Sequence, residues 1–129
     1  MFSPLAADHI QRPRNQGPPT SCTHYGVAGE PGNGSYAEIW LIVENGTIRH
    51  AFYRTHGCPS SVAACSVLCE ISKGRELDRV VTLTGKELLL ILGGLPEGKE
   101  RFADMAIAAI SRSEEKDGTN SSIDSERRM

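Results

Sequence analysis

The sequence lacks three features that would define common classes of protein. It has no apolar run long enough to span a bilayer, and it does not begin with a charged segment followed by an apolar one, as a secretory signal does. It also has no basic stripe of the kind that a phosphate backbone requires, because 14 lysines and arginines are mixed with 16 acidic residues. We therefore expect a soluble, cytoplasmic protein that binds neither nucleic acid nor a membrane.

Cysteine is sparse, and the four residues are Cys22, Cys58, Cys65 and Cys69. In a secreted chain four cysteines can form a disulfide framework, but without an export signal they are expected to be reduced thiols. With 129 residues, of which 39% are hydrophobic, the chain is long enough for one compact core and too short for two. One domain is expected, and the role of each thiol depends on its position there.

The first half of the chain has the pattern of a short helix followed by a sheet. Residues 3–12 begin with a serine and a proline and are followed by a second proline, which are helix start and stop signals. Residues 36–43 and 47–53 are rich in β-formers and are joined by a Glu-Asn-Gly turn, which predicts a hairpin. A further strand near residues 22–28 completes a three-stranded antiparallel sheet.

The second half of the chain has the period of helices. Cys58 is placed at the N-cap of a helix that runs to about residue 73, because a proline follows it at the first helical position. A short helix is expected near residues 77–81, and a capping box opens another over residues 85–92. Residues 102–110 repeat apolar side chains with the spacing of one buried helical face.

These elements predict an α+β domain over residues 1–112, in which the three-stranded antiparallel sheet packs against several helices. The remaining residues, 113–129, are polar, with four serines and only Ile123 to bury besides the terminal methionine. A segment of this composition cannot bury enough apolar surface to fold, so we expect a disordered polar tail.

Several segments, in order and at compatible spacing, resemble the NifU/IscU family of iron-sulfur cluster assembly scaffolds. They are Asp8-His9, Arg12-Pro13-Arg14-Asn15, residues 29–35, Thr55-His56-Gly57-Cys58, Ala63-Ala64-Cys65-Ser66, Lys73-Gly74 and Leu95-Pro96-Glu97-Gly98-Lys99. The resemblance covers residues 3–112, which is specific evidence for a fold like that of IscU and of the NifU N-terminal domain. It implies a non-enzymatic part in iron-sulfur cluster assembly, although function has to be argued at the site.

In that family three cysteines, an aspartate and a histidine converge to hold zinc or a nascent [2Fe-2S] cluster. Carried over residue by residue, only Cys58 matches one of these five ligands. The other four positions fall on Asn33, Ser35, Arg101 and Phe102. A cluster normally needs four thiolate or imidazole donors, so Cys58 alone cannot hold one within a monomer. The cofactors that the resemblance implies, a [2Fe-2S] cluster, iron or zinc, would need further ligands.

Cys58 is the candidate cofactor-binding and metal-binding residue. A thiol at a helix N-cap faces unsatisfied N–H groups and the positive end of the helix, which favours the thiolate. The alternative is that a small side chain is needed to fit a tight Gly-Cys-Pro corner. Cys65 and Cys69, one helical turn apart, have a feasible spacing for a metal pair. We favour the interpretation that they are small buried residues of the helix–sheet interface.

Two functional hypotheses follow from the resemblance. In the first, the protein docks a cysteine desulfurase and accepts sulfur as a Cys58 persulfide, or shares a cluster across a dimer with one thiolate per subunit. In the second, a cluster-free relative acts as an interaction or regulatory module for a desulfurase or an intact scaffold. A third hypothesis, a thiol enzyme built on Cys58 and His56, lacks an orienting carboxylate in the sequence.

Two further features leave alternatives open. Residues 95–99 resemble the Leu-Pro-Pro-Val-Lys chaperone-recognition loop of the family only at their outer positions, and an ordinary helix entry explains them equally well. Binding of an Hsp70-type chaperone is therefore left open, as is the oligomeric state. The other histidines, His9, His24 and His50, have no spacing that indicates a ligand.

Overall fold

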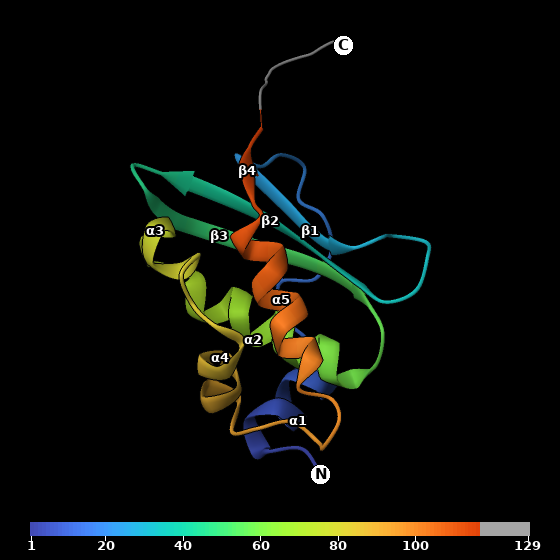
Figure 1. Cartoon of the computed structure of the whole chain (residues 1–129). Coiled ribbons are helices and arrows are strands. Elements are labelled where there is room, and N and C mark those ends of the chain that lie inside the picture. The colour runs from blue at the N-terminus through green and yellow to red at the C-terminus, as the bar shows by residue number, and fades with distance from the viewer. Residues whose placement is uncertain (117–129) are drawn as a thin grey trace.

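An antiparallel sheet of four strands lies on a layer of helices (Figure 1). The computed structural model describes residues 1–116. The strands are β1 His24–Gly29, β2 Tyr36–Glu44, β3 Thr47–His56 and β4 Glu114–Glu115, in the order β3-β2-β1-β4. The helices are α1 Pro4–Gln11, α2 Pro59–Ser72, α3 Leu77–Val80, α4 Gly85–Leu92 and α5 Arg101–Ser111.

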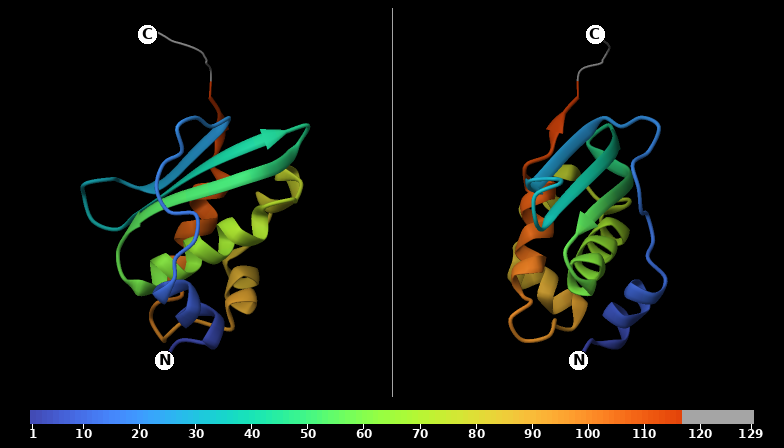
Figure 2. Two further views of the ribbon diagram at one scale, coloured as in Figure 1. Left: turned by 180° about the vertical axis from the view of Figure 1, so that it is seen from behind. Right: turned by 90° about the vertical axis from the view of Figure 1, so that its right-hand side faces the viewer.

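Figure 2 shows from two further sides that the helices lie on one face of the sheet. The predicted α+β class is confirmed.

The fourth strand corrects the prediction of a three-stranded sheet. Glu114 and Glu115 pair with Tyr25 and His24 of β1, whose outer edge would otherwise present unpaired backbone groups. Two exposed glutamates have no apolar alternation, so no strand signal was present in the sequence. This pairing also corrects the predicted tail, because residues 113–116 belong to the fold. The rest of that tail, residues 117–129, lies outside the described residues.

The hairpin of β2 and β3 forms where its turn residues predicted it. Asn45 and Gly46 both have positive φ, 53° and 78°, which a two-residue turn between twisted strands requires. Alternate residues of β2 then face the helices, and Ala37, Ile39 and Leu41 are fully buried there. The sheet is thus apolar on the face that α2 and α5 cover.

A close backbone contact sets α5 against the sheet, and a local cap begins α4. Gly26 of β1 lies against the backbone of Ala109 in α5, where an added Cβ would collide with the Ala109 carbonyl oxygen. The predicted capping box of α4 is confirmed, since the Thr84 hydroxyl accepts the Glu87 N–H at 3.1 Å and the Glu87 carboxylate accepts the Thr84 N–H at 2.9 Å. No helix in the described part of the chain has the length and apolar character needed to cross a membrane.

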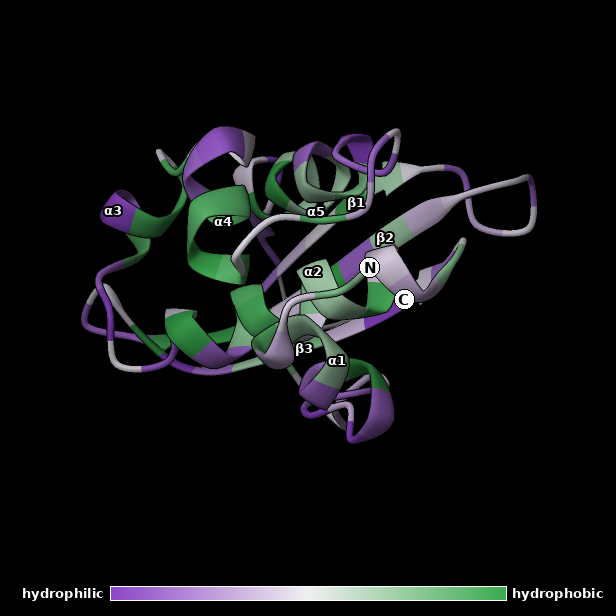
Figure 3. Cartoon of the chain, turned by 90° about the horizontal axis from the view of Figure 1, so that it is seen from below, coloured by the Kyte–Doolittle hydropathy of each residue, from purple (hydrophilic) through white to green (hydrophobic). Residues whose placement is uncertain are grey.

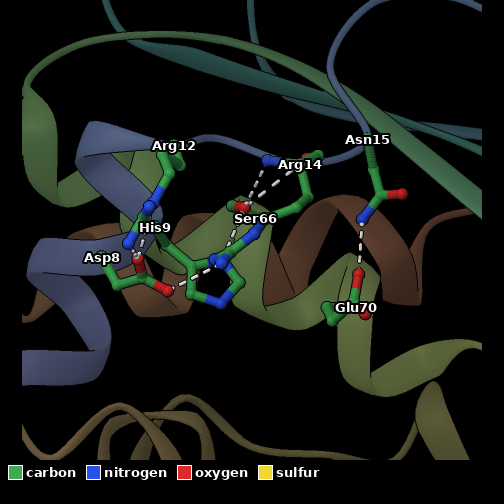
Figure 4. Close-up of polar contacts among 7 residues, drawn as sticks. All are labelled: Asp8, His9, Arg12, Arg14, Asn15, Ser66 and Glu70. Carbon is green, nitrogen blue, oxygen red and sulfur yellow. Dashed lines mark hydrogen bonds and ion pairs between the residues drawn. The ribbon is translucent and has the colours of Figure 1, made fainter.

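A buried histidine holds α1 against α2 (Figure 4). His9 is 6% exposed, and its Nδ1 lies 2.7 Å from the hydroxyl oxygen of Ser66. The same oxygen accepts the backbone N–H of Arg14 at 3.1 Å, so Ser66 holds both the His9 ring and the chain that follows α1. On the surface beside it, Asp8 forms ion pairs with Arg12 and Arg14 at 2.9 Å and 2.7 Å.

Acidification is expected to destabilise the protein through His9. Burial, followed by the positive charge of Arg14, lowers the pKa of His9 below its ordinary value of 6.5. Because the unfolded chain binds the proton more readily, this stabilisation is complete above pH 6.5 and is lost as the pH falls towards the folded pKa. Denaturant unfolding should show the parent losing more unfolding free energy than His9→Gln as the pH is lowered from 7.5 to 5.5. Equal losses would refute a role for His9, since the other histidines are common to both proteins.

Candidate functional site

Cys58 is the N-cap residue of α2, as its position in the sequence predicted. Its backbone is extended, with φ −138° and ψ 177°, and Pro59 follows at the start of the helix. The Cys58 carbonyl accepts hydrogen bonds from the backbone N–H of Ser61 at 2.9 Å and from its hydroxyl at 2.7 Å. The thiol itself forms no capping hydrogen bond and is half-buried. The Cys58 thiol therefore stands at the start of the helix but does not cap it.

The other thiols lie in surroundings that suppress the thiolate. Cys65 and Cys69 are fully buried in the core between α2 and the sheet. Burial raises the pKa of Cys65 to about 12 and the pKa of Cys69 well above its ordinary value. The half-buried Cys22 also has a raised pKa, again because of burial. The core positions of Cys65 and Cys69 agree with the packing interpretation, and Cys58 is the best candidate for thiol chemistry.

Two of the predicted ligand positions lie beside the Cys58 corner, at the start of α5. Phe102 is 3% exposed, and a Cβ built on Gly57 would lie 3.1 Å from Cε1 of its ring. The Arg101 guanidinium lies over that ring, 4.6 Å from the ring centroid, and its Nη1 donates to the Gly98 carbonyl at 2.6 Å. An apolar ring covered by a cation therefore fills the space next to Gly57.

The other two predicted positions lie in the loop between β1 and β2. Asn33 and Ser35 are exposed there. The views in Figures 1 and 2 place this loop on the same side of the molecule as the starts of α2 and α5. Next to it is a hollow of about 310 Å³, lined by Gly32, Gly34, Tyr36 and His56. The loop thus borders a hollow whose other wall includes His56, which precedes Cys58 by two residues.

Sequence reasoning missed the pair formed by Tyr36 and His56. Their rings are stacked across β2 and β3 with centroids 6.2 Å apart. Counting pairs outward from the turn would set Tyr36 opposite Thr55, but an irregularity at Ile42 and Val43 shifts the register by one residue. The turn residues indicate the register next to the turn, but no residue pattern predicts the one-residue shift farther along the strands.

The residues that the structure describes do not form a metal centre. Among residues 1–116 there is no group of three or more histidine, cysteine, aspartate or glutamate side chains that could hold a metal ion. The structure brings Phe102 and Arg101 to the Cys58 corner, where a phenyl ring and a guanidinium supply no lone pair to a metal. The convergence of Asn33 and Ser35 on Cys58 stays a prediction. A [2Fe-2S] cluster or zinc ion held by one copy of this chain does not fit these side chains.

Comparison with known proteins extends over nearly all of the described residues. The family model described as the NifU-like N terminal domain matches residues 1–116. Iron-sulfur cluster assembly scaffold protein IscU 1 of Archaeoglobus fulgidus is 30% identical over 112 residues, covering 87% of this chain and 73% of the relative. The IscU scaffold protein of Aquifex aeolicus is 31% identical over 111 residues, covering 84% and 71%.

Solved structures support the fold. A protein from Fervidobacterium islandicum, described as a scaffold for iron-sulfur cluster assembly in the SUF system, has a TM-score of 0.61 at 13% identity. The match covers 84% of this chain and 93% of that one. A NifU-like N-terminal protein from Brucella abortus has a TM-score of 0.55 at 20% identity, covering 85% and 76%. At these identities the likeness concerns the fold alone.

Alkylation should distinguish Cys58 from the core thiols. In the folded protein at neutral pH, iodoacetamide is expected to modify Cys58 faster than Cys65 or Cys69 by a factor on the order of 100 or more, because only thiolates that solvent can reach react. Mass spectrometry of peptides taken over time measures the three rates, and denatured protein gives the reference. Equal or slower modification of Cys58 would remove the case for this thiol.

Restoring the replaced ligands should create a metal site. The variant Asn33→Cys, Ser35→Asp, Arg101→His and Phe102→Cys would surround Cys58 with donors that suit zinc and iron-sulfur clusters. Truncating the buried Phe102 should cost about 3 kcal/mol without metal, and zinc should recover much of that loss. Zinc titration and thermal unfolding of parent and variant measure both effects. A folded variant that binds zinc no better than the parent would show that the ligand positions are misassigned.

Proposed function

The chain belongs to the family of NifU-like N-terminal domains, and we propose on that basis that it takes part in iron-sulfur cluster assembly by accepting sulfur on Cys58. Its relatives are named as scaffold proteins of that process. The observation that carries the proposal is the contrast at the site. The Cys58 thiol stands at the helix start without a capping hydrogen bond, whereas Arg101 and Phe102, which the family resemblance aligns with two ligand positions, offer a metal no donor atom. A thiol without co-ligands can carry sulfur but cannot complete a cluster.

The sulfur donor in this proposal is the persulfide of a cysteine desulfurase. The Cys58 thiolate attacks the outer sulfur of the donor persulfide, a new S–S bond forms on Cys58, and the S–S bond of the donor breaks. The donor cysteine leaves as a thiolate, and the transferred sulfur keeps its proton. The step requires no external oxidant or reductant, and Cys58 ends as a persulfide. The chain then serves as a sulfur carrier and not as an enzyme.

The surroundings of Cys58 suit this transfer. Cys58 is half-buried at the helix start, and its thiol makes no capping hydrogen bond, so the sulfur is not engaged in holding the helix. Phe102 closes the corner on the side of Gly57, so a donor has to approach from elsewhere. The hollow beside Tyr36 and His56 and the exposed loop that carries Asn33 leave that side of the molecule open.

A second function is favoured by the same replacements. A family member without ligands can dock a desulfurase or an intact scaffold and regulate it without carrying sulfur or a cluster. The two functions can be told apart at the Cys58 sulfur, because only sulfur transfer requires that atom to react. A cluster shared across a dimer, with one Cys58 from each copy, would require two further donors from outside the chain.

The test is a sulfur-transfer reaction with a cysteine desulfurase and free cysteine. The parent should gain one sulfur atom on the peptide that contains Cys58, and Cys58→Ser should lose this signal almost completely, whereas the matched variant Cys22→Ser keeps it. Tight binding of the desulfurase without a persulfide on Cys58 would favour the regulatory function instead. Iron and acid-labile sulfide found together in anaerobically purified parent, and lost in Cys58→Ser, would favour the shared cluster.

A further inference from the structure

The surface of α4 carries apolar side chains that the fold does not bury. The helix contains five consecutive apolar residues, of which Leu88 and Leu92 are fully buried. Leu90 is 78% exposed and Ile91 is 41% exposed. A helix that is apolar on all sides is normally buried on all sides. Seen from below in Figure 3, α4 is hydrophobic after its first turn and lies at the outside of the helix layer.

A groove lies beside this face. It has a volume of about 350 Å³ and is lined by Ile71, Arg75, Arg79, Val80, Leu83 and Ile91. These residues come from α4, α3, the end of α2 and the loops that join them, so the groove is built by segments that the core already fixes. Its apolar floor and the exposed side of α4 meet at Ile91. A contiguous apolar patch with a charged rim is typical of an interaction site.

The charge on the rim is positive and partly preorganised. Nε of Arg75 donates to the Ile71 carbonyl at 2.7 Å, which orients the guanidinium at the groove. Within the described part of the chain Arg75 forms no ion pair, so its remaining N–H groups are available to a carboxylate. Arg79 pairs with Glu76 at 3.2 Å, but both side chains are highly exposed and such a pair is readily exchanged. The Glu87 carboxylate of α4 is held in the capping box of that helix.

We propose that this groove and the exposed face of α4 form a docking site for an acidic amphipathic helix of a partner protein, with its apolar side chains on Ile91 and Leu90 and a carboxylate on Arg75. The apolar floor requires an apolar stripe, and the oriented guanidinium selects an acidic flank. The site is distinct from the Cys58 corner and does not depend on the sulfur-transfer function. The two sites lie at opposite ends of α2, whose 14 residues span about 21 Å.

The probe is a fluorescent synthetic helix of about 15 residues, with leucines at i, i+3, i+4 and i+7 and glutamates beside them. Fluorescence polarisation with the full chain should give saturable binding. Arg75→Glu should weaken it at least about tenfold, because a like charge then faces the glutamates. A second probe with lysines in place of the glutamates should bind Arg75→Glu better than it binds the parent. This reversal distinguishes specific charge pairing from nonspecific hydrophobic binding.

Matched variants locate the binding. Ile91→Ser should weaken binding, whereas Leu5→Ser, which changes an apolar residue of equal 41% exposure on α1, should not. Arg49→Glu, at an exposed arginine of β3, is the control for charge. Circular dichroism establishes that each variant is folded, and alkylation of Cys58 should be unchanged by the bound probe. Absent binding, or equal weakening by test and control variants, would overturn the proposal.

Two other occupants give distinct results that would also overturn it. Tighter probe binding by the full chain carrying Ile123→Ser would assign the groove to the chain's own terminal segment. A concentration-dependent dimer in sedimentation, abolished by Ile91→Ser and unaffected by Leu5→Ser, would assign the face to a second copy.

Discussion

The contact of Phe102 with Gly57 is the constraint on which the candidate site depends. The ring approaches so closely that a Cβ at position 57 would lie 3.1 Å from it, so a side chain at this corner between β3 and α2 would press on the ring. The same contact brings the start of α5 to the start of α2 and leaves Cys58 at the N-cap. On the ligand positions that the family resemblance implies, the phenyl ring of Phe102 stands in place of a cysteine donor.

The helix α2 connects the parts of the molecule that have possible functions. Its start carries Cys58, its middle is locked to α1 through Ser66 and His9, and its end forms one wall of the groove near Arg75. Because α2 is packed under the sheet and largely buried, these three places are held in fixed relation. The proposed docking groove and the proposed sulfur-accepting thiol therefore lie at different ends of one rigid helix.

Much of the fold could be predicted from local sequence. The Asn45-Gly46 turn, the proline after Cys58 and the capping box of α4 each depend on residues a few positions apart, and each formed where it was expected. The resemblance to the scaffold family, which the family match confirms, also came from short segments in order. The N-cap position of Cys58 belongs to this group, because helix starts are governed by neighbouring residues.

The tertiary structure alone decided the rest. The pairing of Glu114 with β1, the shift that sets His56 beside Tyr36, the burial of His9 on Ser66 and the exposure of Leu90 join or separate residues far apart in the chain. The sequence pattern of the five consecutive apolar residues in α4 is that of a buried segment. Only the packing of α2 and α5 determines which of the five are buried and which are exposed. Local pattern determines which backbone conformation a segment prefers, whereas contacts between segments depend on packing that no short stretch of sequence contains.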